Sequence, residues 1–282
     1  MSAMAADPTT DSTATPSRGV GDVLAQCRRE GRAALIGYLP VGFPDVETSI
    51  RAMVAMARAG ADIVEVGIPY SDPLMDGAVI QTAATRALAG GVRVEDVFRA
   101  TAAIRETGTP PVVMSYWNLV LRRGVERFAA DLAAHGGAGI ITPDLVPDEA
   151  GEWIAASGAH GLDRIFLVAP SSTRERLERV TGECRGFVYA ASTMGVTGAR
   201  SEVGSAAPAL VARVREVTDT PVCVGLGVST RQQAADVASF ADGVIVGSAL
   251  VHTLFDEDPE AGIAALEELT RELAAGVREG RS

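Results

Sequence analysis

The stretch Asp62-Ile-Val-Glu-Val-Gly-Ile-Pro-Tyr-Ser-Asp-Pro-Leu-Met-Asp76 joins an apolar, β-branched run to a proline-bounded loop. Such a run is typical of a buried strand, whose successive side chains point to opposite faces. Glu65 therefore shares a face with Ile63 and is expected to point into the interior, whereas the valines on the other face suit packing against helices. Two further carboxylates, Asp72 and Asp76, follow on the loop. A buried carboxylate beside loop carboxylates is the usual material of general acid–base catalysis.

Each of these carboxylates also has a structural interpretation. A single glutamate in an apolar strand is often a core residue with a polar partner. Asp72 precedes a proline and would suit the start of a turn, and Asp76 would suit the cap of a helix over residues 77–88. Three carboxylates at one strand end repel one another, however, so their combination favours a catalytic role.

The composition excludes several classes of protein. The chain has 282 residues with 25 basic and 36 acidic side chains, and its net charge of −11 argues against nucleic acid or an anionic membrane surface as partner. No apolar run reaches the roughly 18 residues of a transmembrane helix. We expect residues 1–17 to be a disordered tail rather than a signal peptide, and residues 18–282 to form a single domain. The scattered cysteines predict reduced thiols in a cytoplasmic protein: Cys27, Cys184 and Cys223.

The basic residues of the chain are all arginines. Schiff-base aldolase chemistry and covalent attachment of pyridoxal phosphate both need a lysine amine, so both are excluded for this chain. His135, His160 and His252 lie far apart in the sequence and show no spacing typical of metal ligands. We therefore predict no metal site.

Eight short apolar runs alternate with amphipathic segments along the chain. The predicted strands cover residues 34–39, 62–68, 111–116, 139–142, 164–169, 186–190, 221–225 and 243–247. The predicted helices include residues 46–59, 94–106, 125–134, 148–157, 208–217, 231–238 and 261–277. Eight such repeats in about 250 residues favour an α/β fold of the (β/α)8 TIM-barrel type, with an extra N-terminal helix over residues 22–31 that closes the bottom. A doubly wound sheet is the second interpretation, but it normally has fewer strands and a glycine-rich first turn.

Glycine-bearing segments follow the last three predicted strands. They are Gly195-Val-Thr-Gly198, Gly225-Leu-Gly227 and Gly247-Ser248, the last of which opens a short helical turn. In a barrel of this kind the active site lies at the C-terminal strand ends, where backbone N–H groups can bind a phosphate without cationic side chains. Glycine after a strand is most often only a turn, but three such segments in succession favour a phosphate site.

These motifs resemble the tryptophan synthase alpha subunit family. The resemblance spans residues 19–277 in order and rests on the quoted stretch, on the glycine segments, and on Tyr116-Trp-Asn118 and Pro143-Asp-Leu145. It implies a carbon–carbon lyase of L-tryptophan biosynthesis that cleaves indole-3-glycerol phosphate to indole and glyceraldehyde 3-phosphate. It also implies a partner, the tryptophan synthase beta subunit, in an alpha2-beta2 heterotetramer. No cofactor is expected in this chain, and pyridoxal phosphate only in the partner.

The resemblance also implies roles for individual residues. Glu65 and Asp76 would be catalytic, and Asp144 would help to organise a mobile lid over residues 193–206. The substrate-binding residues would be Tyr38, Met114, Tyr189 and Thr197. The phosphate-binding residues would be Gly198, Gly227, Gly247 and Ser248.

The chemistry of the residues agrees with this reaction. Without a lysine the indole ring itself must accept the electrons of the breaking bond, after protonation at C3. Glu65 would transfer the protons, and Asp76 would accept a hydrogen bond from the indole N–H. Burial should raise the pKa of Glu65, so that both of its protonation states are accessible near neutrality. Two alternatives stay open: another acid–base barrel enzyme on a phosphorylated sugar, such as an isomerase, and a non-catalytic barrel that binds and activates a beta subunit.

Overall fold

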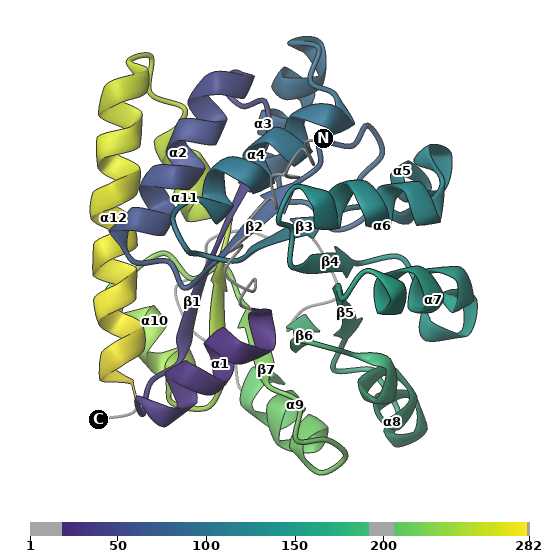
Figure 1. The fold of residues 1–282 in the computed structure, drawn as a ribbon. Helices are drawn as coiled ribbons and strands as arrows, with labels where there is room; N and C mark the ends of the chain where they lie inside the picture. The colour runs from purple at the N-terminus through teal and green to yellow at the C-terminus, as the bar shows by residue number, and fades with distance from the viewer. Residues whose placement is uncertain (1–18, 192–205, 281–282) are drawn as a thin grey trace, which may run out of the picture.

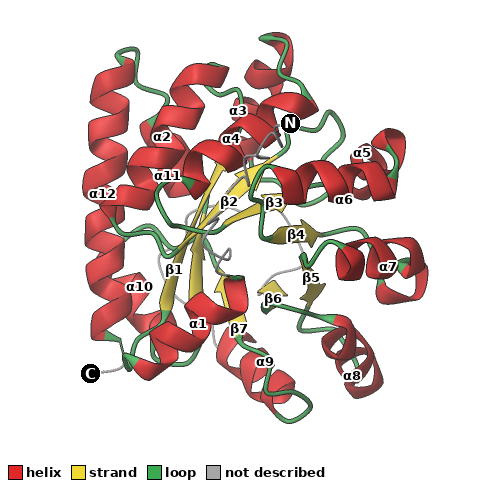
Figure 2. Ribbon diagram, viewed as in Figure 1, coloured by secondary structure: helices red, strands yellow, loops and turns green. Residues whose placement is uncertain are grey.

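A closed barrel of parallel strands forms the centre of the molecule (Figures 1 and 2). The computed structural model describes residues 19–191 and 206–280. Within these ranges eight strands pair in sequence order, and β8 pairs with β1. The strands are β1 (Ala34–Pro40), β2 (Ile63–Gly67), β3 (Pro111–Met114), β4 (Gly139–Thr142), β5 (Asp163–Val168), β6 (Val188–Ala191), β7 (Val222–Gly225) and β8 (Gly243–Val246). The predicted TIM barrel is therefore confirmed, and the doubly wound sheet is wrong.

The helices surround the barrel (Figure 2). In the described ranges they are α1 (Val20–Arg29), α2 (Val46–Ala59), α3 (Ala78–Ala89), α4 (Val94–Arg105), α5 (Trp117–Arg123), α6 (Val125–Ala134), the 3₁₀ turn η1 (Pro147–Glu149), α7 (Gly151–Ala159), α8 (Arg174–Glu183), α9 (Ala206–Arg215), α10 (Arg231–Ala238), α11 (Ser248–Thr253) and α12 (Pro259–Glu279). None of these described helices is long and apolar enough to cross a membrane.

Most predicted helices agree with the structure to within a few residues, but two were missed. The helix α8 consists largely of arginine and glutamate and buries only Leu177, Val180 and Thr181, so its apolar stripe is too short to recognise. The helix α5 has seven residues and buries Val120. The sequence also placed a helix at residues 148–157, where the chain first makes the 3₁₀ turn and starts α7 at Gly151.

Alternation along the strands separates two apolar cores. In β2, Val64 and Val66 belong to the core between strands and helices, whereas Ile63 belongs to a second core inside the barrel. That inner core is filled by side chains of the strands and by Phe187 directly before β6, namely Ala34, Ile36, Ile63, Val112, Ile141, Ile165, Phe187, Cys223 and Ile245. Glu65 lies two residues beyond Ile63 on the same face, so it lies on the C-terminal side of this filled layer.

Helix α1 closes the N-terminal end of the barrel, as predicted, and begins two residues before the expected position. Val20, Val23, Leu24 and Cys27 on one side of the helix are buried against the inner core. The backbone N–H of Val20 donates a hydrogen bond of 3.1 Å to the Asp163 carboxylate at the start of β5. In the described part of the chain, no helix covers the opposite, C-terminal end of the barrel in this way. The site was predicted at that end.

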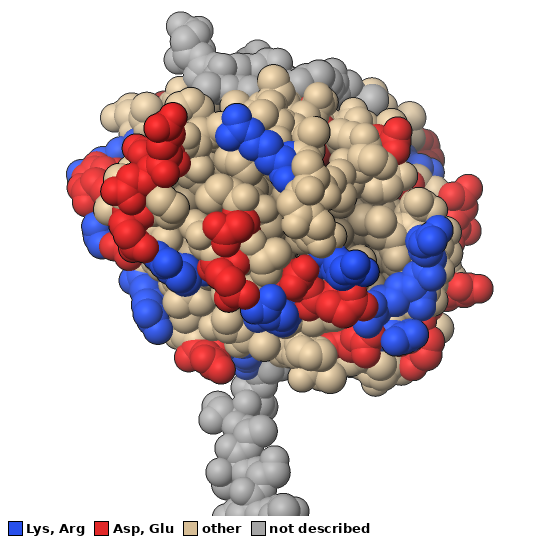
Figure 3. All heavy atoms as spheres, turned by 90° about the horizontal axis from the view of Figure 1, so that it is seen from above, with Lys and Arg blue, Asp and Glu red and all other residues tan. Residues whose placement is uncertain are grey.

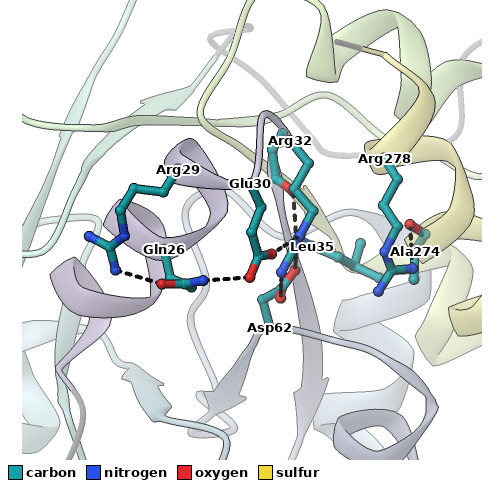
Figure 4. Close-up of polar contacts among 9 residues, drawn as sticks. Gln26, Arg29, Glu30, Arg32, Leu35, Asp62, Ala274 and Arg278 are labelled. Atoms are coloured by element: carbon teal, nitrogen blue, oxygen red, sulfur yellow. Dashed lines mark hydrogen bonds and ion pairs between the residues drawn. The ribbon is translucent and has the colours of Figure 1, made fainter. Parts of the chain in front are cut away.

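A polar cluster anchors the start of β2 at the closed end (Figure 4). Arg32 donates two hydrogen bonds of 2.8 Å to Asp62, and Asp62 also accepts the N–H of Leu35 at 2.9 Å. The side chains of Arg32 and Asp62 are only 15% and 13% exposed. Glu30 accepts a further bond from Arg32 and one from Gln26 of α1. Asp62, directly before β2, is thus bonded to Leu35 of β1 and is linked to α1 through Arg32 and Glu30.

The outer surface carries interspersed charges. On the face shown in Figure 3 acidic and basic side chains lie side by side rather than separated by sign. Exposed pairs such as Arg51–Glu260 and Arg99–Glu47 join neighbouring helices. Exposed ion pairs of this kind contribute little to stability, about 0–1 kcal/mol each.

Asp62→Ala is expected to destabilise the fold by about 2–4 kcal/mol, because the largely buried Arg32 guanidinium loses two of its hydrogen bonds and the Leu35 N–H loses its side-chain acceptor. The measurement is the urea midpoint of unfolding. Glu268→Ala is the matched control, because Glu268 pairs with Arg271 on the surface and is 69% exposed; its effect should stay within about 0.5 kcal/mol. Equal midpoints for the two variants would contradict the anchoring role of Asp62.

Candidate active site

A pocket opens at the C-terminal ends of the strands, where the sequence placed the site. It is bounded by residues from every strand except β4, by the β2–α3 loop and the start of α3, and by the segments that follow β3, β7 and β8. The lining residues are Tyr38, Glu65, Ile68, Met75, Asp76, Ile80, Met114, Tyr116, Leu167, Tyr189, Gly225, Leu226, Gly227, Ile245, Gly247 and Ser248. This list contains Glu65, Asp76 and all the predicted substrate- and phosphate-binding residues except Thr197 and Gly198, which lie outside the described residues, as does most of the predicted lid.

Glu65 is the most deeply buried acid of the pocket, with 2% exposure. Its position in β2 pairs with Tyr38 of β1 on one side and Val112 of β3 on the other. The Oε2 atom is buried and has no hydrogen-bond partner among the described residues. Burial and, to a smaller extent, the charge of Asp76 raise the pKa of Glu65 to about 8. The alternative of a core glutamate with a satisfied carboxyl group is therefore not supported.

Asp76 lies at the end of the β2–α3 loop and faces the same pocket. Burial raises the pKa of its carboxyl group, and a hydrogen bond from the Tyr116 hydroxyl opposes that shift. The predicted alternative, in which Asp76 caps a helix, is wrong because Gly77 occupies the N-cap position of α3. Asp72 is exposed and accepts a hydrogen bond from Ser71, so only two of the three carboxylates expected to act together face the pocket.

Two half-buried tyrosines shape the pocket next to glycines. A Cβ atom added to Gly67 would lie 2.4 Å from the Tyr38 hydroxyl, and one added to Gly225 would lie 2.6 Å from the Tyr189 hydroxyl. Both glycines end strands, so their missing side chains make room for the aromatic rings of the neighbouring inward-facing positions. Burial raises the pKa of both phenols well above the usual value, with added repulsion from the pocket carboxylates. The family resemblance identified these two tyrosines, but the sequence pattern did not give the reason for the two glycines.

The glycine segments after β7 and β8 lie on the pocket wall. Gly227 has φ of +72°, in the left-handed region that glycine adopts without strain. Gly247 precedes α11, and a Cβ atom added to it would meet nothing closer than the Tyr38 ring at 3.4 Å. A ligand can therefore approach the backbone closely at Gly247, as the binding of an anionic group by backbone N–H groups requires.

Tyr116 is the main pocket residue to which the sequence assigned no role. It stands at the N-cap of α5, is 5% exposed, and makes hydrogen bonds to the β2–α3 loop. Asp144, which was expected to organise the lid, accepts the N–H of Trp117 at 2.9 Å and so holds the first turn of α5. Its relation to the lid lies outside the described residues.

The histidines lie away from this pocket. His160 contacts Glu126 at 2.7 Å, and His135 contacts the backbone oxygen of Asp131. Within the described part of the chain, no three acidic, histidine or cysteine side chains are grouped so that they can hold a metal ion.

Comparison with known proteins gives the family. The family model described as tryptophan synthase alpha chain matches residues 24–278. The tryptophan synthase alpha chain of Mycobacteroides abscessus is 65% identical over 257 residues, which cover 91% of this chain and 96% of that relative. This chain belongs to the tryptophan synthase alpha chain family. The predicted family, its lyase reaction and its place in tryptophan biosynthesis are thereby confirmed, and membership implies a beta-subunit partner.

Solved structures of tryptophan synthase have the same fold. One from Mycobacterium tuberculosis is 61% identical, with a TM-score of 0.87 and coverage of 92% of this chain and 98% of that chain. A mutant tryptophan synthase alpha subunit from Pyrococcus furiosus is 35% identical, with a TM-score of 0.80 and coverage of 86% and 98%. The barrel is therefore shared even where about two thirds of the residues differ.

Glu65→Gln should change how stability depends on pH. The pKa of Glu65 rises from 4.5 to about 8 on folding, so the folded state binds more protons between these values. The stability from this carboxyl group is therefore fully present below pH 4.5 and is lost as the pH rises through about 8. The variant cannot ionise, so its Tm should match that of the wild type near about pH 5 and exceed it near about pH 9, where each pKa unit corresponds to about 1.4 kcal/mol.

The exposed variant Glu268→Gln is the control for this measurement and should show the wild-type pH dependence. A difference between Glu65→Gln and wild type that is the same at both pH values would contradict the raised pKa of Glu65.

Proposed function

We propose that Glu65 and Asp76 carry out the cleavage of indole-3-glycerol phosphate to indole and glyceraldehyde 3-phosphate. The main support is that both carboxylates face one pocket and that Glu65 is buried without a partner for Oε2 among the described residues. The reaction breaks the bond between indole C3 and the glycerol side chain. Because the chain contains no lysine, the bonding electrons pass into the indole ring rather than into a Schiff base.

Glu65 transfers the protons in this proposal. Its neutral form protonates indole C3 and gives an indolenine, whose C2–N bond can accept electrons. The resulting carboxylate then takes the proton of the side-chain hydroxyl next to the ring. The carbon–carbon bond breaks, its electron pair restores the indole, and the aldehyde forms. A pKa of about 8 makes both protonation states of Glu65 accessible near neutrality, which is the condition for one group to act as acid and then as base.

Asp76 binds the indole nitrogen. When C3 is protonated, positive charge develops on that nitrogen, and a carboxylate that accepts its N–H hydrogen bond stabilises the charge. Asp76 lies at the pocket wall with Met75 and Ile80. In such partly apolar surroundings the interaction is stronger than it is in water.

The two ends of the substrate are assigned to different residues of the one pocket. Tyr38, Met114 and Tyr189 are assigned to the indole, and Ile68 and Leu167 line the same pocket. Gly227, Gly247 and Ser248 are assigned to the phosphate, for which their backbone N–H groups would serve as donors. Thr197 and Gly198 are assigned to the substrate and to the phosphate by the resemblance alone.

The complex and its setting are part of the proposal. Family membership implies a beta subunit, and we propose an alpha2-beta2 heterotetramer. Pyridoxal phosphate would belong to the beta subunit, because a chain without lysine cannot attach it covalently. A cytoplasmic location fits the buried free thiols of Cys27, Cys184 and Cys223.

Glu65→Gln should lower the kcat for indole release by at least about 10²–10⁴-fold, because the amide cannot carry a proton. The assay follows indole and glyceraldehyde 3-phosphate, first with this chain alone and then with the beta subunit. Binding of glycerol 3-phosphate is the control and should be unchanged. Near-wild-type turnover by the folded variant would overturn the assignment. A rearranged sugar phosphate without indole would favour the isomerase alternative, and no turnover by the wild type in either condition would favour a non-catalytic partner.

Gly247→Asp should weaken the binding of glycerol 3-phosphate by at least about 100-fold, because two like charges about 4 Å apart repel by several kcal/mol at a half-buried site. The affinity is measured by calorimetry. Gly151→Asp is the matched control, because Gly151 begins α7, is exposed, and has no atom within 4 Å of an added Cβ. Equal affinity of the two variants for glycerol 3-phosphate would contradict the assignment of the phosphate site to the segment after β8.

A further inference from the structure

The Tyr116 hydroxyl makes three hydrogen bonds to one short segment. It accepts the backbone N–H of Leu74 at 3.0 Å and that of Met75 at 3.1 Å. It donates its own proton to Oδ1 of Asp76 at 3.4 Å. A phenol has one donor and two acceptor sites, so this hydroxyl is fully used on three successive residues of the β2–α3 loop.

Tyr116 itself is held firmly. It directly follows Ser115 at the end of β3, where the Ser115 hydroxyl donates to the Tyr116 carbonyl oxygen at 2.9 Å. The next residue, Trp117, donates its N–H to Asp144. The Tyr116 ring stacks on Tyr70, with ring centroids 5.0 Å apart and an angle of 28°. The residue is 5% exposed, so it belongs to the rigid end of the barrel rather than to the loop.

Apart from this ring stack, in which Tyr70 belongs to the loop itself, several described residues of the loop are exposed to solvent. Leu74 is 75% exposed and Asp72 is exposed. The carbonyl oxygen of Asp76 accepts a hydrogen bond from Gln81 at 2.7 Å, which fixes the backbone but not the carboxyl group. Among the described residues, the orientation of the Asp76 side chain therefore depends on the hydrogen bond from Tyr116.

We propose that Tyr116 is a positioning residue that fixes Asp76 for the indole nitrogen by holding Oδ1 and leaving Oδ2 to the substrate. This inference rests on the proposed role of Asp76. The two N–H groups that donate to the phenol oxygen polarise the hydroxyl and make it a stronger donor to the carboxylate. At 3.4 Å the bond is long, as is common for catalytic groups before substrate binds.

The test compares two phenylalanine variants. Tyr116→Phe keeps the ring stack and removes the hydroxyl from Asp76, whereas Tyr70→Phe changes the other ring of the same stack. In the complex with the beta subunit, Tyr116→Phe should lower the kcat for indole formation by about 10–100-fold, the range expected for a lost hydrogen bond to a charged group. Glycerol 3-phosphate binding should stay within about twofold, and Tyr70→Phe should leave kcat within about twofold.

A double-mutant cycle separates positioning from a general structural effect. If Tyr116 acts through Asp76, then Tyr116→Phe in an Asp76→Asn background should cost less than about twofold in the remaining turnover. An unchanged kcat for Tyr116→Phe, or the same loss in both backgrounds, would overturn the proposal.

A second measurement does not depend on turnover. The titration of the Asp76 carboxyl group is followed by ¹³C NMR of aspartate-labelled chain, with Asp76→Asn for assignment. The titratable groups of the described residues that face it are Glu65, Tyr38, Tyr116 and Tyr189. The hydrogen bond from Tyr116 favours the ionised form of Asp76, so its removal in Tyr116→Phe should raise the pKa of Asp76. Tyr70→Phe should leave that pKa unchanged. Wild-type turnover by Asp76→Asn would refute the proposed function, and an unshifted titration in Tyr116→Phe would refute this inference.

Discussion

The buried carboxyl group of Glu65 is the constraint on which the rest of the structure depends. An ionised carboxylate in an apolar interior costs several kcal/mol unless it is paired. Glu65 is 2% exposed, and its Oε2 atom lacks a partner among the described residues. The group avoids that cost by remaining protonated until the pH approaches its pKa of about 8. Burial without a partner thus gives Glu65 a proton to donate near neutrality. It also leaves a polar group unsatisfied in the interior, and the rest of the barrel has to compensate for that loss of stability.

The compensation comes from the closed end of the same strand. Asp62 directly precedes β2, and its carboxylate has partners: it pairs with Arg32 and accepts the backbone N–H of Leu35. Between the two carboxylates lies the inner apolar layer that helix α1 covers. Satisfied polar groups and dense packing at one end thus hold an unsatisfied group in place at the other. This division matches the general rule for such barrels, in which stability resides at the N-terminal face and chemistry at the C-terminal face.

Local pattern was enough to predict most of this arrangement. Alternation in β2 gave the face of Glu65, and apolar runs gave the eight strands, because both depend on neighbours in the chain. Tyr116 is the instructive failure. Its hydroxyl binds Leu74, which is 42 residues away in the sequence, and no periodicity reports such a contact. The prediction that Asp76 caps a helix was wrong for a related reason. The N-cap of α3 is the next residue, Gly77, and helix boundaries depend on tertiary contacts as well as on propensity.

The strand-end glycines show how the pocket gains its shape. From the sequence, a glycine at a strand end is explained as a turn residue. In the structure the Tyr38 ring lies against the backbone of Gly67, and the Tyr189 ring lies against that of Gly225. Each glycine thus leaves room for a large side chain of the neighbouring strand in the barrel mouth. An aromatic wall next to Glu65 excludes water from the carboxyl group and thereby raises its pKa. The glycines of β2 and β7 therefore act on the proton chemistry of Glu65 without touching the substrate, through the rings for which they make room.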